Sequence, residues 1–202
     1  MTGPGAAPPA PWDCRLEAVV WWHRARPGAA AAMPAGVRVP VTVGAFVRYL
    51  DTPVGTYHEL AGCPALLLDG VVPAGHVAFI AVDSAASLRG GRENWALPKI
   101  PAAFAWADHG AIAARDPAGA WALEARVRAR GLRFALALAA RCVQMAEDGQ
   151  RVAFPVRGRG LAAPARVRVA ATGAERPGWL AAGVHAGVVV RAARLRVGRP
   201  AT

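Results

Sequence analysis

The chain has 202 residues, of which 54% are apolar and 18% are charged, with a formal net charge of +11. This composition is typical of one globular domain and excludes collagen-like, coiled-coil and disordered chains. No apolar run approaches the ~20 residues of a membrane span, and the first residues lack the basic start of a signal peptide. We therefore expect a cytoplasmic protein without membrane contacts, with residues 1–12 as a loose lead-in and residues 13–202 as a single domain.

Short apolar segments separated by Gly, Pro and Asp predict strands in the first half of the chain. We expect these strands at residues 16–22, 37–43, 45–50, 56–60, 65–68 and 75–82. Prolines bracket an alanine run at residues 27–34, which predicts a helix of about two turns. A second short helix is expected to begin after Asp83 or Ser84 and to end at Gly90-Gly91.

The second half of the chain continues this pattern. We expect strands at residues 102–108, 111–115, 120–130, 151–157, 165–171 and 187–197. The fold class is therefore a β-rich α+β domain, an antiparallel barrel or sandwich with a few short helices. Phe79 and Ile80 should lie on opposite faces of a central strand in a closed or nearly closed sheet.

The basic residues are biased strongly toward arginine. Of the 24 basic residues only Lys99 is a lysine, which leaves 23 arginines. Abundant Ala, Gly and Pro accompany this bias, as in the product of a GC-rich genome, so the positive charge does not by itself predict a nucleic-acid partner. The single lysine is notable because lysine can lose its proton near neutral pH and arginine cannot.

Lys99 lies in an apolar segment between two prolines. We expect Trp95, Leu97 and Ile100 to line a pocket around its amine. Burial disfavours the charged ammonium and increases the share of neutral amine, which is a nucleophile toward ketones and aldehydes. A carboxylate close to the amine would oppose this effect, so the distance between the two groups decides the outcome.

Other catalytic and metal-binding patterns were not found in the sequence. The five histidines and the three cysteines (Cys14, Cys63 and Cys142) are scattered, so neither a metal site nor a disulfide framework is predicted. No nucleotide-binding glycine motif is present. We therefore expect no metal and no organic cofactor.

The segment Gly91-Arg92-Glu93-Asn94-Trp95-Ala96-Leu97-Pro98-Lys99 resembles the Schiff-base lysine motif of the acetoacetate decarboxylase superfamily. A second block, residues 51–59, resembles the family stretch that ends in an active-site glutamate, here Glu59. A weaker match places Arg15 on a family arginine that contacts the substrate carboxylate. Where the decarboxylase itself has a second lysine after the catalytic one, this chain has Ile100.

This resemblance implies an imine-forming carbon–carbon lyase. The expected partner is a small ketoacid, which Lys99 would bind covalently. Glu59 would move protons or orient the imine, and Arg15 would hold the carboxylate. Both decarboxylation of a β-keto acid and aldolase-dehydratase chemistry are compatible with it. Family members tend to be homo-oligomers, so a homo-oligomer is expected.

An alternative function comes from the arginines alone. A non-catalytic basic module built on the same barrel would contact polyanions, and its affinity would fall steeply with salt. No basic stripe interleaved with aromatic residues is visible, which argues against nucleic acid as the partner.

Overall fold

The computed structural model describes residues 6–36, 38–69, 72–107 and 110–201, and strands dominate this part of the chain. Its helical elements are the α-helix α1 (Ala85–Trp95) and the 3-10 turn η1 (Ala29–Ala32), which is shorter than the predicted two turns. The strands are β1 (Trp12–Arg24), β2 (Arg38–Val39), β3 (Val41–Asp51), β4 (Tyr57–Cys63), β5 (Leu66–Asp69), β6 (Val72–Gly75), β7 (Phe79–Val82), β8 (Lys99–Pro101), β9 (Ala103–Trp106), β10 (Ala111–Arg115), β11 (Ala122–Ala129), β12 (Phe134–Met145), β13 (Arg151–Thr172) and β14 (Gly183–Val197). Neither helical element has the length and apolar character that a membrane crossing needs.

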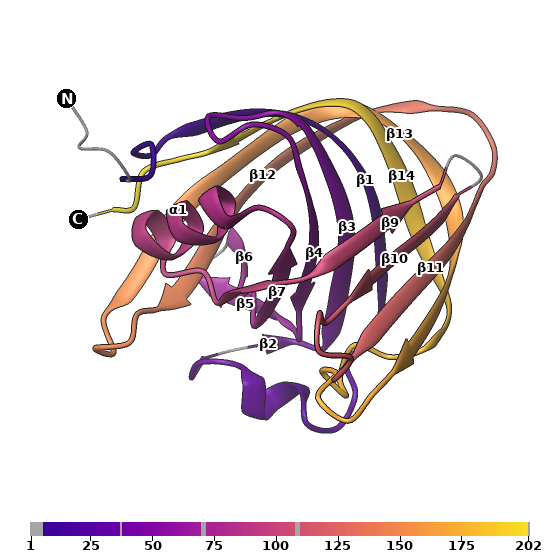
Figure 1. Cartoon of the computed structure of the whole chain (residues 1–202), viewed down its shortest axis with the longest axis horizontal. Coiled ribbons are helices and arrows are strands. Elements are labelled where there is room, and N and C mark those ends of the chain that lie inside the picture. The colour runs from indigo at the N-terminus through magenta and orange to yellow at the C-terminus, as the bar shows by residue number, and fades with distance from the viewer. Residues whose placement is uncertain (1–5, 37, 70–71, 108–109, 202) are drawn as a thin grey trace.

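All of these strands belong to one curved sheet. Its order is β2-β5-β6-β12-β13-β14-β1-β3-β4-β7-β8, and β11, β10 and β9 branch from β13. Figure 1 shows β13, β14, β1 and β3 arching over the molecule while β9–β11 fold back across the curve. The β-rich fold class is confirmed.

The expectation of a closed or nearly closed antiparallel sheet is wrong in two respects. Two strand pairs, β6–β12 and β7–β8, are parallel, and the sheet does not close into a barrel. The strand at one end of the sheet order, β8, has only three residues. It ends at Pro101, which has no backbone N–H to donate to a neighbouring strand.

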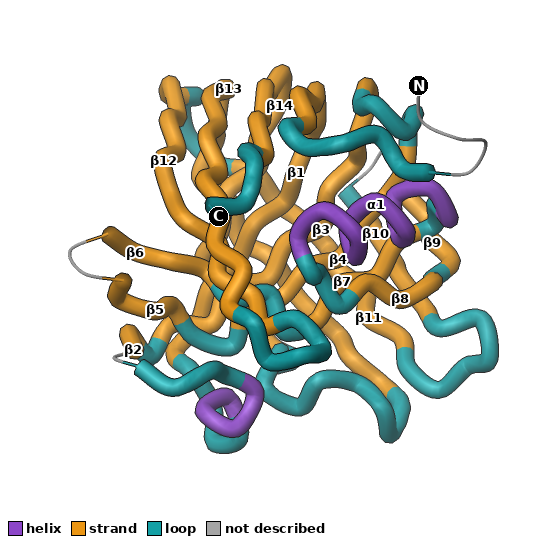
Figure 2. Tube along the Cα trace, turned by 90° about the vertical axis from the view of Figure 1, so that its left-hand side faces the viewer, coloured by secondary structure: helices purple, strands orange, loops and turns teal. Residues whose placement is uncertain are grey.

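The two faces of the sheet are covered by different elements. We call the side enclosed by β9–β11 the inner face; its core includes Val19 and Trp21 of β1. We call the side against α1 the helix face; its core includes Cys14 and Leu16 of the same strand. The alternation follows from the two-residue period of a strand. Figure 2 shows α1 lying against one side of the strands.

Phe79 and Ile80 follow this alternation, as predicted. Phe79 packs against the inner-face core, which also holds Ala81, whereas Ile80 is buried on the same side of β7 as Val82 of the helix-face core. β7 is the second strand from the end of the sheet and is therefore not central.

Helix α1 does not end at Gly90-Gly91, contrary to the prediction. It continues to Trp95 and ends with Ala96 in a left-handed conformation, φ 52°. A Cβ at Gly90 would lie 2.6 Å from the Trp12 ring, and one at Gly91 would lie 2.5 Å from Cε of Lys99. The two glycines therefore serve close packing and not helix termination.

The C-terminal third holds longer strands than the sequence predicts. β13 is continuous over 22 residues where two separate strands were expected, and β12 was not predicted. Gly160 lies at a shift of register between β13 and β14, where a Cβ would lie 3.0 Å from Ala193. The glycines and prolines between the two expected strands do not end a strand. They lie inside β13, which has a bulge at this point.

Candidate active site

Lys99 begins β8 and its side chain is directed between the sheet and α1. Only 3% of its surface is exposed. The side-chain oxygen of Ser84 caps the helix by accepting from the Ser87 N–H at 3.1 Å, and Gly91 leaves room for the lysine chain. The Arg92 guanidinium donates to the backbone carbonyl of Lys99, which fixes the start of β8 to the helix.

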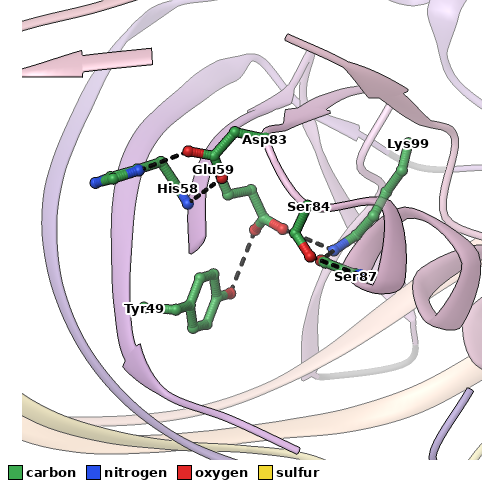
Figure 3. Close-up of polar contacts among 7 residues, drawn as sticks. All are labelled: Tyr49, His58, Glu59, Asp83, Ser84, Ser87 and Lys99. Atoms are coloured by element: carbon green, nitrogen blue, oxygen red, sulfur yellow. Dashed lines mark hydrogen bonds and ion pairs between the residues drawn. The ribbon is translucent and has the colours of Figure 1, made fainter. Parts of the chain in front are cut away.

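The amine of Lys99 contacts three groups on the helix face. Its Nζ donates to Oε2 of Glu59 at 2.9 Å and to Oγ of Ser87 at 2.8 Å (Figure 3). It also lies 5.3 Å from the centroid of the Tyr57 ring, within range of a cation–π contact. The two strongest candidates from the sequence, Lys99 and Glu59, are therefore brought together.

Glu59, on β4, is almost as buried as the lysine, at 6% exposed. Its second oxygen, Oε1, accepts from the Tyr49 hydroxyl at 3.3 Å. The rings of Tyr49 and Tyr57 stack at 4.3 Å, and the Tyr57 hydroxyl hydrogen-bonds to both Ser87 and Tyr49. Five polar side chains thus form a closed ring of contacts in the interior.

The two tyrosines remain protonated throughout the ordinary pH range. Burial, followed by the charge of Glu59, raises the pKa of both Tyr49 and Tyr57 well above the usual value. Both hydroxyls can therefore act as hydrogen-bond donors next to the carboxylate.

Cys14 faces the same site from β1. Burial, and then the charge of Glu59, raises the pKa of its thiol to about 12. Because the thiolate is the nucleophilic form, Cys14 is an inert neutral group there.

Lys99 and Glu59 form a buried ion pair. Nζ of Lys99 lies 2.9 Å from Oε2 of Glu59, and the two side chains are 3% and 8% exposed. A proton transfer from Nζ to Glu59 would release the nucleophilic amine without any net change of buried charge. A carboxylate thus lies within hydrogen-bond distance of the amine, as a proton transfer between them requires.

The predicted pocket residues separate into two groups. Trp95 is buried in the helix-face core, where it packs edge-on against Trp12 at 5.0 Å, and Leu97 packs against the same core. Ile100 packs against the inner-face core instead, so its prediction as a pocket residue is wrong. Consecutive residues of a strand point to opposite faces, and Ile100 follows Lys99 directly.

Arg15 is not brought to this site. It is exposed on the face of β1 opposite Cys14 and Leu16, and it lines a surface groove with Arg159 and Arg194. The same strand alternation is the reason: at this end of β1 the cysteine, not the arginine, faces Glu59.

Sequence reasoning missed three members of the ring: Ser87, Tyr49 and Tyr57. Spacing held a signal for two of them. Tyr57 precedes Glu59 by two residues and so shares its strand face, and Ser87 precedes Gly91 by four and so shares its helix face. Tyr49 depends on the register between β3 and β4, in which it lies opposite Tyr57.

A cleft of about 360 Å³ borders the ring and is lined by Arg48, Tyr49, Tyr57, His58 and Asp83, among others. At its wall, Nδ1 of His58 lies 2.7 Å from Oδ2 of Asp83 (Figure 3). The two tyrosines line this cleft and also contact the buried pair, so they connect the cleft to the ring.

The described residues bring no three His, Cys, Asp or Glu side chains close enough together to bind a metal ion.

Comparisons with known proteins give matches in structure only. No protein-family model matches the sequence, and no curated protein matches it. Acetoacetate decarboxylase from Legionella pneumophila matches with a TM-score of 0.64 at 15% identity, covering 100% of this chain and 92% of its own. An acetoacetate decarboxylase-like enzyme from Sphingomonas wittichii RW1 matches with 0.64 at 17% identity, covering 99% and 95%.

A third match is the enduracididine biosynthesis enzyme MppR complexed with pyruvate. Its TM-score is 0.69 at 14% identity, and the match covers 98% of this chain and 93% of that one. All three matches span nearly the whole of both chains, which confirms at the level of fold the resemblance carried by the lysine motif. The chain has the fold of the acetoacetate decarboxylase superfamily.

Proposed function

We propose that this protein is an imine-forming carbon–carbon lyase that acts on a small ketoacid through Lys99. The observation that carries the proposal is the buried Lys99 amine, hydrogen-bonded to Glu59 at 2.9 Å and to Ser87 at 2.8 Å. A structural lysine in a chain with 23 arginines has no need of this enclosed position, whereas a nucleophilic amine does.

The reaction would begin with proton transfer from Nζ to Glu59. The neutral amine attacks the carbonyl carbon of the ketoacid, and the resulting carbinolamine loses water to give an iminium. The bond to the departing group, carbon dioxide or an aldehyde, then breaks, and its electron pair moves toward the iminium nitrogen to form an enamine. Protonation of the enamine and hydrolysis by water return the product ketone and the free amine.

Glu59 and the two tyrosines of the ring would each have a role in these steps. Glu59 would take the proton of the ammonium and return it to the hydroxyl that leaves as water. Tyr49 and Tyr57 would donate to substrate oxygens from the wall of the cleft. Arg15 has no role in this proposal because it does not face the amine.

The comparisons support the proposal. Two of the structural matches are named as a decarboxylase and a decarboxylase-like enzyme, and MppR is described with pyruvate bound. Another MppR structure holds the condensation product of pyruvate and imidazole 4-carboxaldehyde. Decarboxylation and aldol-type chemistry both use the same iminium, so either reaction fits the proposed site.

Borohydride trapping tests this proposal. The protein is incubated separately with pyruvate, acetoacetate and each of a panel of related ketoacids, and is then reduced with borohydride. After digestion, the masses of the peptides are measured by mass spectrometry. We expect the reduced adduct on the Lys99 peptide and none in the Lys99→Arg variant, because a guanidinium forms no imine under these conditions. A Lys99 peptide left unmodified by the whole panel would refute the proposal.

A second candidate function, polyanion binding, rests on the arginine pattern of the outer strand ends. Arg15, Arg194 and Arg159 lie directly opposite one another across β1, β14 and β13. Asp13 and Asp51 line the same groove and offset part of this charge, and an anion would relieve the repulsion that remains. Retention on heparin at physiological ionic strength would favour this function, and elution well below that strength would exclude it.

A further inference from the structure

A groove of about 330 Å³ opens on the inner face of the sheet, away from Lys99. It lies between the strands β1, β14 and β13 on one side and β9–β11 on the other, where the branch folds back across the curve (Figure 1). Its volume is within the range of small-molecule sites.

The floor and walls of the groove are apolar. Val19 and Val189 lie opposite each other on β1 and β14, and Ile112 and Val127 face them from β10 and β11. All four belong to or pack against the inner-face core, so the groove is the open end of that core. Apolar surface in this position gains free energy when a ligand covers it.

The rim of the groove carries an excess of cations. Arg48, Arg133 and Arg191 line it, whereas Glu17 is its only carboxylate among the described residues. Oε1 of Glu17 lies 3.5 Å from Nη1 of Arg191, which is 58% exposed, so this pair is weak and can rearrange. Three guanidinium groups thus share one carboxylate, so at least one of them can bind an anion.

The groove is distinct from the Lys99 site. Glu17 and Arg48 are paired residues of β1 and β3 on the inner face, while their chain neighbours Leu16 and Tyr49 are paired on the helix face. The sheet itself therefore separates the two regions. Among the described residues, Arg48 alone lines both this groove and the cleft beside the tyrosines.

We propose that this inner-face groove binds an amphipathic carboxylate, with its apolar tail over Val19, Ile112 and Val127 and its carboxylate on Arg48 and Arg191. A planar carboxylate matches the fork geometry of a guanidinium, and the tail covers the open end of the core. The groove would thus hold a second ligand in addition to the substrate of Lys99, without a covalent step.

Calorimetry with decanoate tests the proposal on the whole chain. We expect decanoate to bind, decanol to bind at least about tenfold more weakly, and acetate not to bind measurably, because the site needs both the charge and the tail. Arg48→Gln and Arg191→Gln should each weaken decanoate binding about fivefold, as for a charge-assisted hydrogen bond at an exposed guanidinium. The control Arg166→Gln removes an equal charge from the exposed side of β13 and should change nothing.

A variant that fills the groove provides an independent check. Ala163→Phe places a ring on the groove floor and should abolish decanoate binding, provided its melting temperature shows that it folds. Equal binding of decanol, or equal weakening by Arg166→Gln, would overturn the proposal. The Lys99→Arg variant should keep full decanoate affinity, so loss of imine trapping and loss of decanoate binding are separate results.

Discussion

The helix-face site and the inner-face groove use neighbouring residues of the same strands in opposite ways. On β1, Leu16 is buried in the helix-face core, while Glu17, one residue later, lies on the groove rim. On β3, Tyr49 donates to Glu59, while Arg48 lies on the groove rim. A strand therefore builds two chemically different sites from alternate positions.

The difference between the sites lies in how charge is compensated. In the helix-face site one cation meets one carboxylate, and hydroxyls occupy the remaining hydrogen-bonding positions, because an unpaired buried polar group is costly. At the groove three arginines meet one carboxylate, and water can solvate the excess. Each prediction below tests a consequence of this contrast.

The largest effect is expected from breaking the buried pair. Glu59→Ala removes the carboxylate that is bonded to Lys99 and should lower the free energy of unfolding by about 3 kcal/mol. The matched change at the groove, Glu17→Ala, breaks an exposed pair and should cost less than about 0.5 kcal/mol. Urea denaturation of both variants measures the difference, and equal losses would contradict the contrast between the two sites.

Substitutions of Gly90 and Gly91 in α1 should distinguish a loss of stability from a displacement of the Lys99 amine. Gly91→Ala puts a Cβ 2.5 Å from Cε of Lys99, so the lysine must move; we expect a loss of about 1–3 kcal/mol in stability and at least a tenfold loss in imine trapping. Gly90→Ala instead meets the Trp12 ring at 2.6 Å and should cost similar stability while leaving more of the trapping. Trapping that survives fully in Gly91→Ala would place the reactive amine elsewhere.

A smaller effect is expected from a substitution of Tyr49, which belongs to the ring of five polar side chains. Tyr49→Phe removes one neutral donor to Glu59 and should lower the free energy of unfolding by about 1 kcal/mol. The variant also loses the hydroxyl that is proposed to donate to substrate oxygens, so trapping should slow by a few fold. No change in either quantity would show that the 3.3 Å contact contributes nothing.

The smallest effect concerns pH and lies outside both sites. Burial lowers the pKa of His23, whose Nε2 accepts from the N–H of Ala181 at 3.3 Å. The folded chain then binds fewer protons than the unfolded chain, so stability is fully present above the ordinary histidine pKa and is lost as pH falls below it. We expect the melting temperature to drop by a few degrees between pH 7.5 and 5.5, and His23→Gln to reduce that drop. An identical drop in both proteins would assign the pH dependence to other groups.

The parts of the fold and of the site that could be predicted are those whose residues stand out in the sequence itself. Lys99 was identifiable because it is the only lysine and lies in an apolar, proline-bounded segment, and most strands followed from their turn residues. Arg15 and Ile100 were misplaced because a shift of one residue reverses the face of a strand, and only the assembled sheet sets that register. The glycines of α1 were misread because their role is close contact with Trp12 and Lys99, which come from distant parts of the chain.

The central claim is that the carbonyl substrate reacts on the helix face, at Lys99. A crystal structure of the protein after borohydride reduction with the ketoacid that traps best tests it directly. The account predicts continuous density from Nζ of Lys99 into the reduced ligand, with the ligand against Glu59 and the two tyrosines. A ligand held instead between Arg48 and Arg191, with the Lys99–Glu59 pair intact, would contradict it.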